Sequence, residues 1–332
     1  MIFTLIVCTY MRPKALLTLL NSVVSQTLYP DEIIIVDGSV NDETRVMLEA
    51  NYFNNLNYYL VEAKDRGLTR QRNFGIEKVN KRSEIVCFLD DDIILDSNYF
   101  KHIIATYSLY PEALAVGGYI TNEVHWEQNK KPTSISDYFC FDDWCRKEPT
   151  RFKVRRMFGL EPDVPPGWLP SFSHMRAIGF LPPSNNIYEV ELFMGGVSSY
   201  RMAVFKTITF SDYFEGYGLY EDADFCLRLA KQEPLYVNTA ARCTHHHAVE
   251  GRPNMFKYGQ MVIRNGWYIW RVKYSNPGLK SKIKWHCTAL LLTILTFLGC
   301  IQSNKRQAMF MEGLGRIFGW CKLVFDKPKI NY

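Results

Sequence analysis

The first 118 residues alternate between strand-length apolar runs and helix-length segments, and this alternation restricts the chain to a few α/β folds. Strand-like runs occur at 2–8, 32–37, 56–62 and 85–90. Three of these runs are almost uninterrupted in apolar residues, as expected for parallel strands that are buried on both faces of a sheet. Helix-length segments intervene at about 13–26, 41–52 and 67–80. The pattern predicts βαβ units in an open, mostly parallel sheet flanked by helices.

The rhythm breaks over 119–190, where Pro, Trp and Phe are frequent and no clean period is present. This stretch is interpreted as a loop-rich insert or a lid over an acceptor. Regularity then returns with a strand near 187–194, helices near 200–207 and 221–232, and a strand near 234–239. We therefore expect one domain over 1–250, made of a first half (1–118), the variable insert (119–190) and a second half (191–250), followed by a basic, aromatic helical region over 251–332.

Charge divides the chain more sharply than its net value of +5 indicates. Residues 242–332 carry fifteen Lys/Arg and three Asp/Glu, whereas residues 1–241 carry 24 and 31. A basic C-terminal region predicts an anionic partner, either a nucleic acid or a membrane surface. The uncharged run 287–301 has no purpose in nucleic-acid binding, so 255–325 is predicted to contact an anionic membrane, with a solvated surface helix as the alternative.

The length of that uncharged run favours a segment that lies in the membrane interface over one that spans the bilayer. Fifteen residues of helix cover roughly 22 Å, which is short of the roughly 30 Å hydrocarbon core. We expect a cytoplasmic protein that is peripheral or monotopic on the inner face of the cell membrane. Nine cysteines without a CxxC pair are read as reduced thiols, which fits that compartment. The apolar N-terminus is expected to be a first strand and not a signal peptide.

Polar residues follow each predicted strand, at the sheet edge where α/β folds bind ligands. They are Thr9 to Arg12, Asp37, the segment from Lys64 to Asn73, and Asp90-Asp91-Asp92. Three adjacent carboxylates repel one another unless a cation or a basic cluster neutralises them. Hard oxygen ligands suit Mg²⁺ or Mn²⁺ shared with a diphosphate. The alternative for the three aspartates is an acidic turn that caps the next helix. The Arg66/Arg70/Arg72/Asn73 cluster is either a phosphate clamp or an ordinary charged helix face.

Asp222 lies at the head of an otherwise apolar helix face formed by Phe225, Cys226 and Leu229. A carboxylate in a core-facing position needs a partner or a function. It is either the N-cap of its own helix or a general base whose pKa is raised by partial burial. Among the three consecutive histidines, one is a candidate to complete a metal shell, although a packing or surface role is equally compatible. Zinc is not expected, because no cysteine or further histidine lies at ligand spacing.

As a set, these motifs resemble family 2 glycosyltransferases with the GT-A fold. The matching segments are TYxR, IIIVDGS, GLTRQRNFGI, FLDDD, GGVSSYR and YEDADFCLRL, in the family's order and over about residues 1–275. The resemblance implies a hexosyltransferase that uses a nucleotide-diphosphate sugar, a divalent metal and a glycan or lipid-linked saccharide acceptor. It makes 1–118 the nucleotide-sugar half, 119–190 a variable acceptor-side insert and 191–250 the acceptor and catalytic-base half. Asp37-Gly38-Ser39 departs from the commoner double-Asp form of the family.

The resemblance also implies roles for individual residues. Thr9 and Asp37 would contact the nucleotide base and ribose. Arg70 and Asn73 would belong to the donor site. Arg12 and Asp91, at the ends of the same strands, are further candidates for binding the donor. Asp90 and Asp92 would occupy the DxD positions at the metal and diphosphate, and His245 would be a further metal ligand. In Glu221-Asp222, Asp222 would be the base of an inverting transfer. The competing hypotheses are a nucleotidyltransferase on a related sheet and a catalytically silent nucleotide-sugar-binding membrane scaffold.

Overall fold

The computed structural model describes residues 1–130, 135–214, 216–247, 254–302 and 305–330. The chain divides into two compact units, each built from two separate stretches of sequence. Unit 1 consists of Met1–Val124 and Leu181–Arg252, and unit 2 consists of His125–Phe180 and Pro253–Tyr332. The boundary expected between residues 250 and 251 lies outside the described residues.

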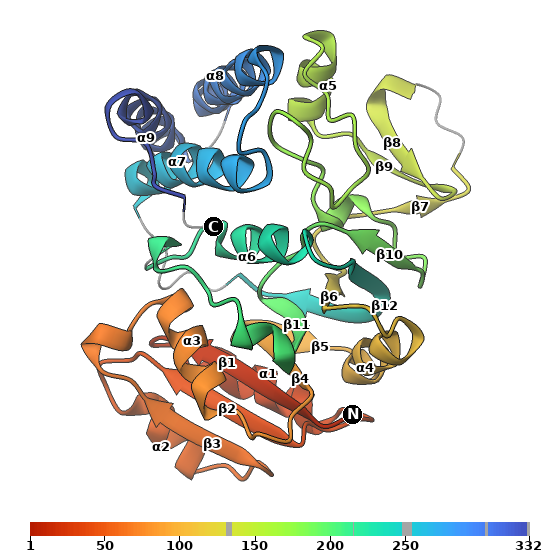
Figure 1. The fold of residues 1–332 in the computed structure, drawn as a ribbon, viewed down its shortest axis with the longest axis vertical. Coiled ribbons are helices and arrows are strands. Elements are labelled where there is room, and N and C mark those ends of the chain that lie inside the picture. The colour runs from red at the N-terminus through yellow and green to blue at the C-terminus, as the bar shows by residue number, and fades with distance from the viewer. Residues whose placement is uncertain (131–134, 215, 248–253, 303–304, 331–332) are drawn as a thin grey trace. The chain divides into compact units, whose positions relative to one another are not determined.

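Among the described residues, nine strands of unit 1 form one mixed sheet (Figure 1). Eight follow the order β10-β12-β6-β11-β4-β1-β2-β3, and β5 pairs with β12. Strands β1 to β4 pair in parallel, whereas β11 runs antiparallel to both β4 and β6. The bounds are β1 (Phe3–Thr9), β2 (Glu32–Asp37), β3 (Leu56–Leu60), β4 (Ile85–Asp90), β5 (Ile93–Leu95), β6 (Ala115–Ile120), β10 (Ile187–Val190), β11 (Val197–Arg201) and β12 (Leu235–His245).

Amphipathic helices cover this sheet, as the alternation of the sequence predicts. Helix α1 buries Leu16, Leu19, Leu20 and Val23, which recur at helical spacing and join the core of the parallel strands. The predicted α/β architecture is thus confirmed for unit 1. The helices are α1 (Pro13–Val24), α2 (Glu43–Glu49), α3 (Leu68–Lys78), α4 (Tyr99–Leu109) and α6 (Glu221–Leu229).

Two elements differ from the sequence-based expectation. The helix expected near 200–207 is wrong at its start, because β11 extends to Arg201 and only a 3-10 helix, Met202–Lys206, follows. Strand β11 fills the gap between β4 and β6, so pairing on both sides determines its conformation. The last strand does not end near 239 but continues to His245, since its second half pairs with β5 and β6 beyond an irregularity.

The insert belongs largely to unit 2 and contains regular structure. A small antiparallel sheet joins β7 (Glu127–Gln128), β9 (Trp144–Lys147) and β8 (Tyr138–Phe141), followed by α5 (Thr150–Met157). Cys140 and Cys145 face each other across the β8–β9 hairpin and form a disulfide. The prediction of reduced thiols is therefore wrong for these two residues, because the hairpin register brings their Cα atoms within 4.1 Å. The other seven cysteines are free thiols, as predicted, and the compartment stays a prediction.

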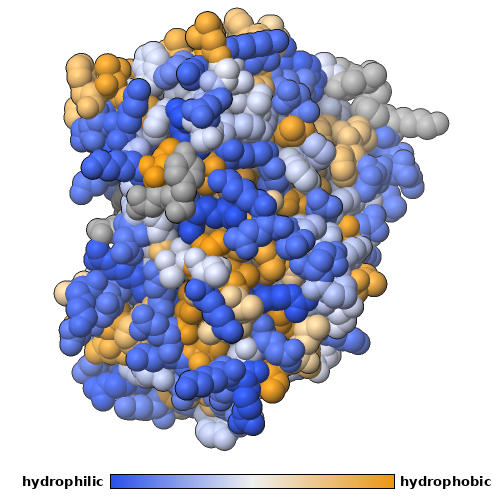
Figure 2. Space-filling view, in the orientation of Figure 1, coloured by the Kyte–Doolittle hydropathy of each residue, from blue (hydrophilic) through white to orange (hydrophobic). Residues whose placement is uncertain are grey.

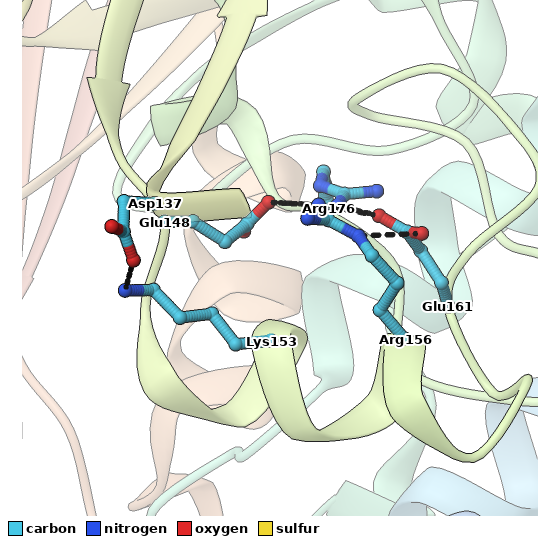
Figure 3. Close-up of polar contacts among 6 residues, drawn as sticks. All are labelled: Asp137, Glu148, Lys153, Arg156, Glu161 and Arg176. Carbon is cyan, nitrogen blue, oxygen red and sulfur yellow. Dashed lines mark hydrogen bonds and ion pairs between the residues drawn. The ribbon is translucent and has the colours of Figure 1, made fainter. Parts of the chain in front are cut away.

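Ion pairs hold the insert where apolar periodicity is missing (Figure 3). The Glu148 carboxylate is fully buried and accepts hydrogen bonds from Arg156 and Arg176, both at 3.1 Å. Glu161 accepts from the same two arginines at 3.0 and 2.7 Å. The attraction between these two cations and two anions offsets the cost of removing each charge from water. An isolated buried charge would have no such compensation.

The remaining part of unit 2 consists of α7 (Met255–Lys273), α8 (Leu279–Gln302) and α9 (Arg306–Phe325). Helices α7 and α9 approach so closely that a Cβ atom at Gly259 or Gly315 would overlap the backbone of the facing helix. Helix α8 is longer than its uncharged run, because residues 279–286 extend it. Its segment Leu279–Ile301 has a mean hydropathy of 1.5 and is long and apolar enough to cross a membrane by length and composition alone.

Candidate active site

The three consecutive aspartates lie at the carboxyl end of β4 and point to different partners. Asp91 is buried, and it accepts hydrogen bonds from the Thr9 hydroxyl at 2.7 Å and from the Arg12 guanidinium at 3.0 Å. Asp92 has its carboxylate 3.2 Å from His245 Nε2. The Asp90 side chain is 38% exposed. Asp91 therefore ties the end of β4 to the end of β1, while Asp90 and Asp92 remain as candidate ligands.

Asp90, Asp92 and His245 form a group that fits a divalent cation. One ligand atom from each of the three side chains lies within 4.8 Å of the other two. Carboxylate oxygens dominate the set, which is the chemistry that Mg²⁺ and Mn²⁺ prefer. The group unites the end of β4 with the end of β12, as the convergence of strand ends predicts.

Glu123 contributes a carboxylate that sequence reasoning missed. Its Oε1 lies 3.2 Å from His245 Nδ1 and 3.0 Å from His247 Nε2. His245 thus contacts Asp92 with one ring nitrogen and Glu123 with the other, an arrangement that orients the imidazole. Burial alone would lower the pKa of His245, but the hydrogen bonds to Asp92 and Glu123 outweigh it and raise the pKa to about 10.

Burial raises the pKa of two carboxyl groups in this region, Asp90 and Asp91. The pKa of Asp91 rises to about 6, because burial outweighs the opposing effects of Arg12 and Thr9. The pKa of Asp90 is also raised, by burial and by the charge of Asp92, against the opposing charge of Arg72. A cation at this strand end would reverse these costs by favouring the charged carboxylates.

Asp222 is the second residue of α6, and the structure does not place it at the N-cap, which is Tyr220. Its carboxylate accepts hydrogen bonds from the Gly195 N–H at 3.0 Å and from the Ala223 N–H at 2.7 Å. Burial raises the pKa of Asp222, while these two backbone donors oppose the shift. The carboxylate is thus held in a fixed orientation and is more basic than an exposed aspartate.

Gly195 and Gly196 lie between the two carboxylate groups. Asp222 contacts the Gly195 N–H, and the Asp90 N–H donates to the Gly196 carbonyl at 3.0 Å. A Cβ atom at Gly196 would overlap the Asp90 carboxylate, and one at Gly195 would crowd Arg72 and Glu221. Glycine is therefore required for Asp90 and Asp222 to lie on either side of one turn.

Arg72 is a buried cation that lies between Glu221 and Asp90. Its guanidinium pairs with Glu221, lies 3.7 Å from Asp90, and stacks over the rings of Phe210 and Phe88 at 5.2 and 5.5 Å. Arg72 and Glu221 are 2% and 4% exposed, respectively. Glu221 is thus a buried partner of Arg72, one residue before the candidate base.

The other predicted donor-site residues do not all join the acidic cluster. Asp37 is fully buried and accepts from the Tyr58 hydroxyl at 2.9 Å and from the Ser39 N–H at 2.8 Å. Asn73 exchanges two hydrogen bonds with the Phe210 backbone, at 2.9 and 3.0 Å. Arg70 donates to the Lys64 carbonyl at 3.2 Å. The contacts of these three residues connect α3 and β2 to neighbouring segments.

The pKa of Glu221 leads to a prediction about stability. Burial raises this pKa from 4.5 to about 8, although Arg72 opposes the shift. Between pH 4.5, the ordinary pKa of glutamate, and about pH 8, its pKa in the folded protein, the folded state binds more protons than the unfolded state. Glu221 therefore contributes stability at low pH, and this contribution is lost as pH rises through about 8. We expect the urea midpoint of the metal-free wild type to fall more steeply than that of Glu221→Gln between about pH 5 and about pH 8.5. Parallel pH profiles for the two proteins would contradict this assignment.

Comparison with known proteins identifies the family. Residues 4–175, just over half of the chain, match Glycosyl transferase family 2. The chain belongs to glycosyl transferase family 2, which confirms the resemblance predicted from its motifs.

Two curated relatives match shorter segments. The O-antigen chain rhamnosyltransferase RfbN of Salmonella typhimurium is 29% identical over 105 residues, which are 32% of this chain and 33% of that protein. The glucosyl-dolichyl phosphate glucuronosyltransferase of Haloferax volcanii is 30% identical over 120 residues, which are 35% of this chain and 37% of that protein. The match therefore spans about a third of the length of each relative.

The fold is shared with a solved structure, the mannosyltransferase PcManGT from Pyrobaculum calidifontis in complex with GDP-Man and Mn²⁺. That structure aligns with 98% of this chain and 88% of its own, at 14% sequence identity and a TM-score of 0.55. The similarity confirms the predicted GT-A-like fold, with a central sheet flanked by helices and with C-terminal helices.

Proposed function

We propose that this protein transfers a sugar from a nucleotide-diphosphate sugar to a hydroxyl group of a glycan or a lipid-linked saccharide, with inversion at the anomeric carbon. Family membership supports glycosyl transfer as the class of reaction. The relatives act on an O-antigen chain and on a dolichyl phosphate-linked sugar by their names, which supports a saccharide acceptor for this chain.

One observation carries this proposal. Asp222 and the Asp90/Asp92/His245 group flank the same glycine turn, Gly195-Gly196. A fixed carboxylate next to a cation-binding group is the arrangement that direct displacement needs, with a base at the acceptor and positive charge at the leaving diphosphate. A nucleotidyltransferase has no role for Asp222 on its helix, so the geometry favours glycosyl transfer.

In this mechanism the Asp222 carboxylate takes the proton of the acceptor hydroxyl as its oxygen attacks the anomeric carbon. The bond between that carbon and the diphosphate oxygen breaks, and the nucleoside diphosphate leaves. The Gly195 and Ala223 N–H groups hold the carboxylate in place for this step. Asp90, Asp92 and His245 would hold Mg²⁺ or Mn²⁺, which when bound stabilises the negative charge of the diphosphate. Thr9 and Asp37 are proposed to lie at the nucleotide, with Arg12 and Asp91 supporting the strand end.

A thermal-shift comparison of UDP, GDP, dTDP and CMP, with and without Mn²⁺, tests the donor site. Ligand bound to the folded state stabilises it by about 2.7 kcal/mol at 100 times the dissociation constant, so an occupied site raises the melting temperature. We expect one nucleotide to stabilise the wild type in a manner that requires Mn²⁺, and the stabilisation to be absent in Asp92→Ala.

A matched control is Asp96→Ala, which removes an aspartate beyond β5 that is not in the candidate metal group. This variant should keep the nucleotide-dependent shift. A shift that persists in Asp92→Ala would exclude the proposed metal group, and a nucleotide-dependent shift without turnover of any donor would favour the silent scaffold. Release of pyrophosphate instead of a nucleoside diphosphate during turnover would favour the nucleotidyltransferase.

A further inference from the structure

We propose that the exposed apolar faces of α8 and α9 together form a membrane-docking surface, which lies in the plane of an anionic bilayer without spanning it. This inference concerns unit 2 and does not depend on the proposed reaction.

Each of the two helices has a stripe of large apolar side chains on its solvent-facing side. On α8 these are Leu290, Ile294 and Leu298, which are 46%, 45% and 54% exposed. On α9 they are Phe310, Leu314 and Phe318, which are 50%, 36% and 46% exposed. A spacing of four residues keeps each set on one face of its helix. Exposed apolar area of this extent is unusual on a protein that contacts water alone.

The two stripes are neighbours because the helices pack side by side in antiparallel directions. The rings of Phe297 and Phe310 lie 5.8 Å apart at one end, and the Trp320 indole N–H donates to His286 Nδ1 at 2.8 Å toward the other. Figure 1 shows α8 and α9 next to each other, and Figure 2 shows hydrophobic groups at their outer edge.

The opposite sides of both helices face the interior of unit 2. Trp285 and Ala289 of α8 and Leu323 of α9 are buried, and they form one apolar cluster with side chains of α7. The exposed stripes therefore point away from that cluster.

The charge around this apolar face fits anionic headgroups. Residues 279–329 carry nine Lys/Arg and two Asp/Glu. Both acidic residues are paired with arginine, Glu312 with Arg316 at 2.7 Å and Asp326 with Arg264 at 3.0 Å. The antiparallel arrangement brings the exposed Lys280 and Lys282 of α8 to the same end of the helix pair as the last turn of α9. Each such lysine strengthens the attraction to an anionic surface.

Two observations favour an in-plane position over a membrane span. The uncharged part of α8, 287–301, covers roughly 22 Å as a helix, less than the roughly 30 Å hydrocarbon core. The preceding turns carry Lys280, Lys282 and Lys284, and the Lys284 ammonium lies 4.8 Å from the centre of the Phe172 ring within unit 2. One side of α8 is thus fixed to the folded unit, and a span would expose those contacts to lipid.

Vesicle flotation with the full chain tests the docking surface. We expect the protein to float with vesicles of phosphatidylcholine plus phosphatidylglycerol, and to bind less to phosphatidylcholine alone. Leu298→Asp or Phe318→Asp should lower the partition coefficient about tenfold or more, since a half-exposed large apolar side chain would otherwise enter the lipid. Lys280→Glu combined with Lys282→Glu should reduce binding to the anionic vesicles by about tenfold or more and leave binding to the neutral ones unchanged.

The matched controls are Leu109→Asp and Lys81→Glu, which change exposed residues of unit 1 and should leave binding unchanged. Equal loss of binding in controls and docking variants would overturn the proposal. So would vesicle-bound protein that resists extraction by alkaline carbonate, because this behaviour indicates a span. A dimer in vesicle-free solution that dissociates in Leu298→Asp would assign the face to a second copy of the chain instead.

Discussion

Replacing Asp222 with Asn is expected to lower kcat for sugar transfer by about 10²- to 10⁴-fold while the Kd of the nucleotide stays nearly constant. Asparagine preserves the shape of the side chain, and its single amide oxygen still accepts one of the two backbone hydrogen bonds, from the Gly195 N–H or the Ala223 N–H. The amide cannot take the proton of the acceptor hydroxyl. The nucleotide is proposed to bind on the Asp90 side of the glycine turn, so its affinity should persist. Initial rates of nucleoside diphosphate release and calorimetric titration of the nucleotide measure the two quantities.

Asp224→Asn is the matched control, because it makes the same chemical change on the same helix. Asp224 is fully buried and pairs with Arg228 at 2.8 Å, away from the glycine turn. This variant should lose stability through the weakened ion pair and keep the kcat of the wild type. If Asp222→Asn lost nucleotide binding together with turnover, the division between base and donor site would be wrong.

The parts of the site that the sequence predicts are those where a polar residue interrupts an apolar pattern. Asp90 to Asp92 end an apolar strand, and Asp222 heads an apolar helix face. Because parallel strands end at a common edge, Asp90 to Asp92 could be expected to lie near the polar residues that follow the other strands, without knowledge of the pairing partners. The structure brings Asp90, Asp92 and His245 together in this manner.

Long-range partners are the parts that the sequence does not reveal. Arg72 and Glu221 are 149 residues apart, and each resembles a solvated charge in its local segment. One feature of the sequence does indicate that this face of α3 is buried, namely Gly75, one turn after Arg72. The helix lies so close to the sheet there that a Cβ atom at Gly75 would crowd Ile6 and Val36. A glycine within a helix thus marked the buried face of α3, which also carries the buried Gln71.

Strand β11 and the disulfide were missed for a related reason. The segment Val197–Arg201 is a strand because β4 and β6 pair with it on both sides, a tertiary effect that overrides local preference. The cysteine pair depends on the register of the β8–β9 hairpin. Local composition specifies neither feature.

At about pH 9, above the pKa of Glu221, replacing Arg72 with Met is expected to destabilise the protein by about 3–5 kcal/mol, the largest loss of stability that we predict. The substitution removes the cation that pairs with the buried Glu221 and lies near Asp90. Glu221 would then be a buried carboxyl group without compensation, since its Oε2 has no hydrogen-bond partner even in the wild type. Urea unfolding of the metal-free protein, followed by circular dichroism, measures the loss.

Arg45→Met is the matched control, because Arg45 also pairs with two carboxylates, Asp42 at 3.0 Å and Glu49 at 3.4 Å, but on the surface. Exposed ion pairs contribute about 0–1 kcal/mol, so this variant should unfold close to the wild type.

The double variant Arg72→Met/Glu221→Gln separates loss of the ion pair from loss of packing. It removes both charges, and it should recover part of the stability that Arg72→Met loses, because a neutral amide costs less to bury than an unpaired carboxylate. Arg72→Lys should not recover the lost stability. The planar guanidinium of Arg72 offers separate donors to Glu221 and Asp90 while it stacks on Phe210, and the compact ammonium group of lysine cannot make all three contacts. If Arg72→Met and Arg45→Met lost equal stability, the buried pair would not hold α3 and α6 together. The fixed orientation of Asp222 beside Glu221 would then have to come from its backbone hydrogen bonds alone.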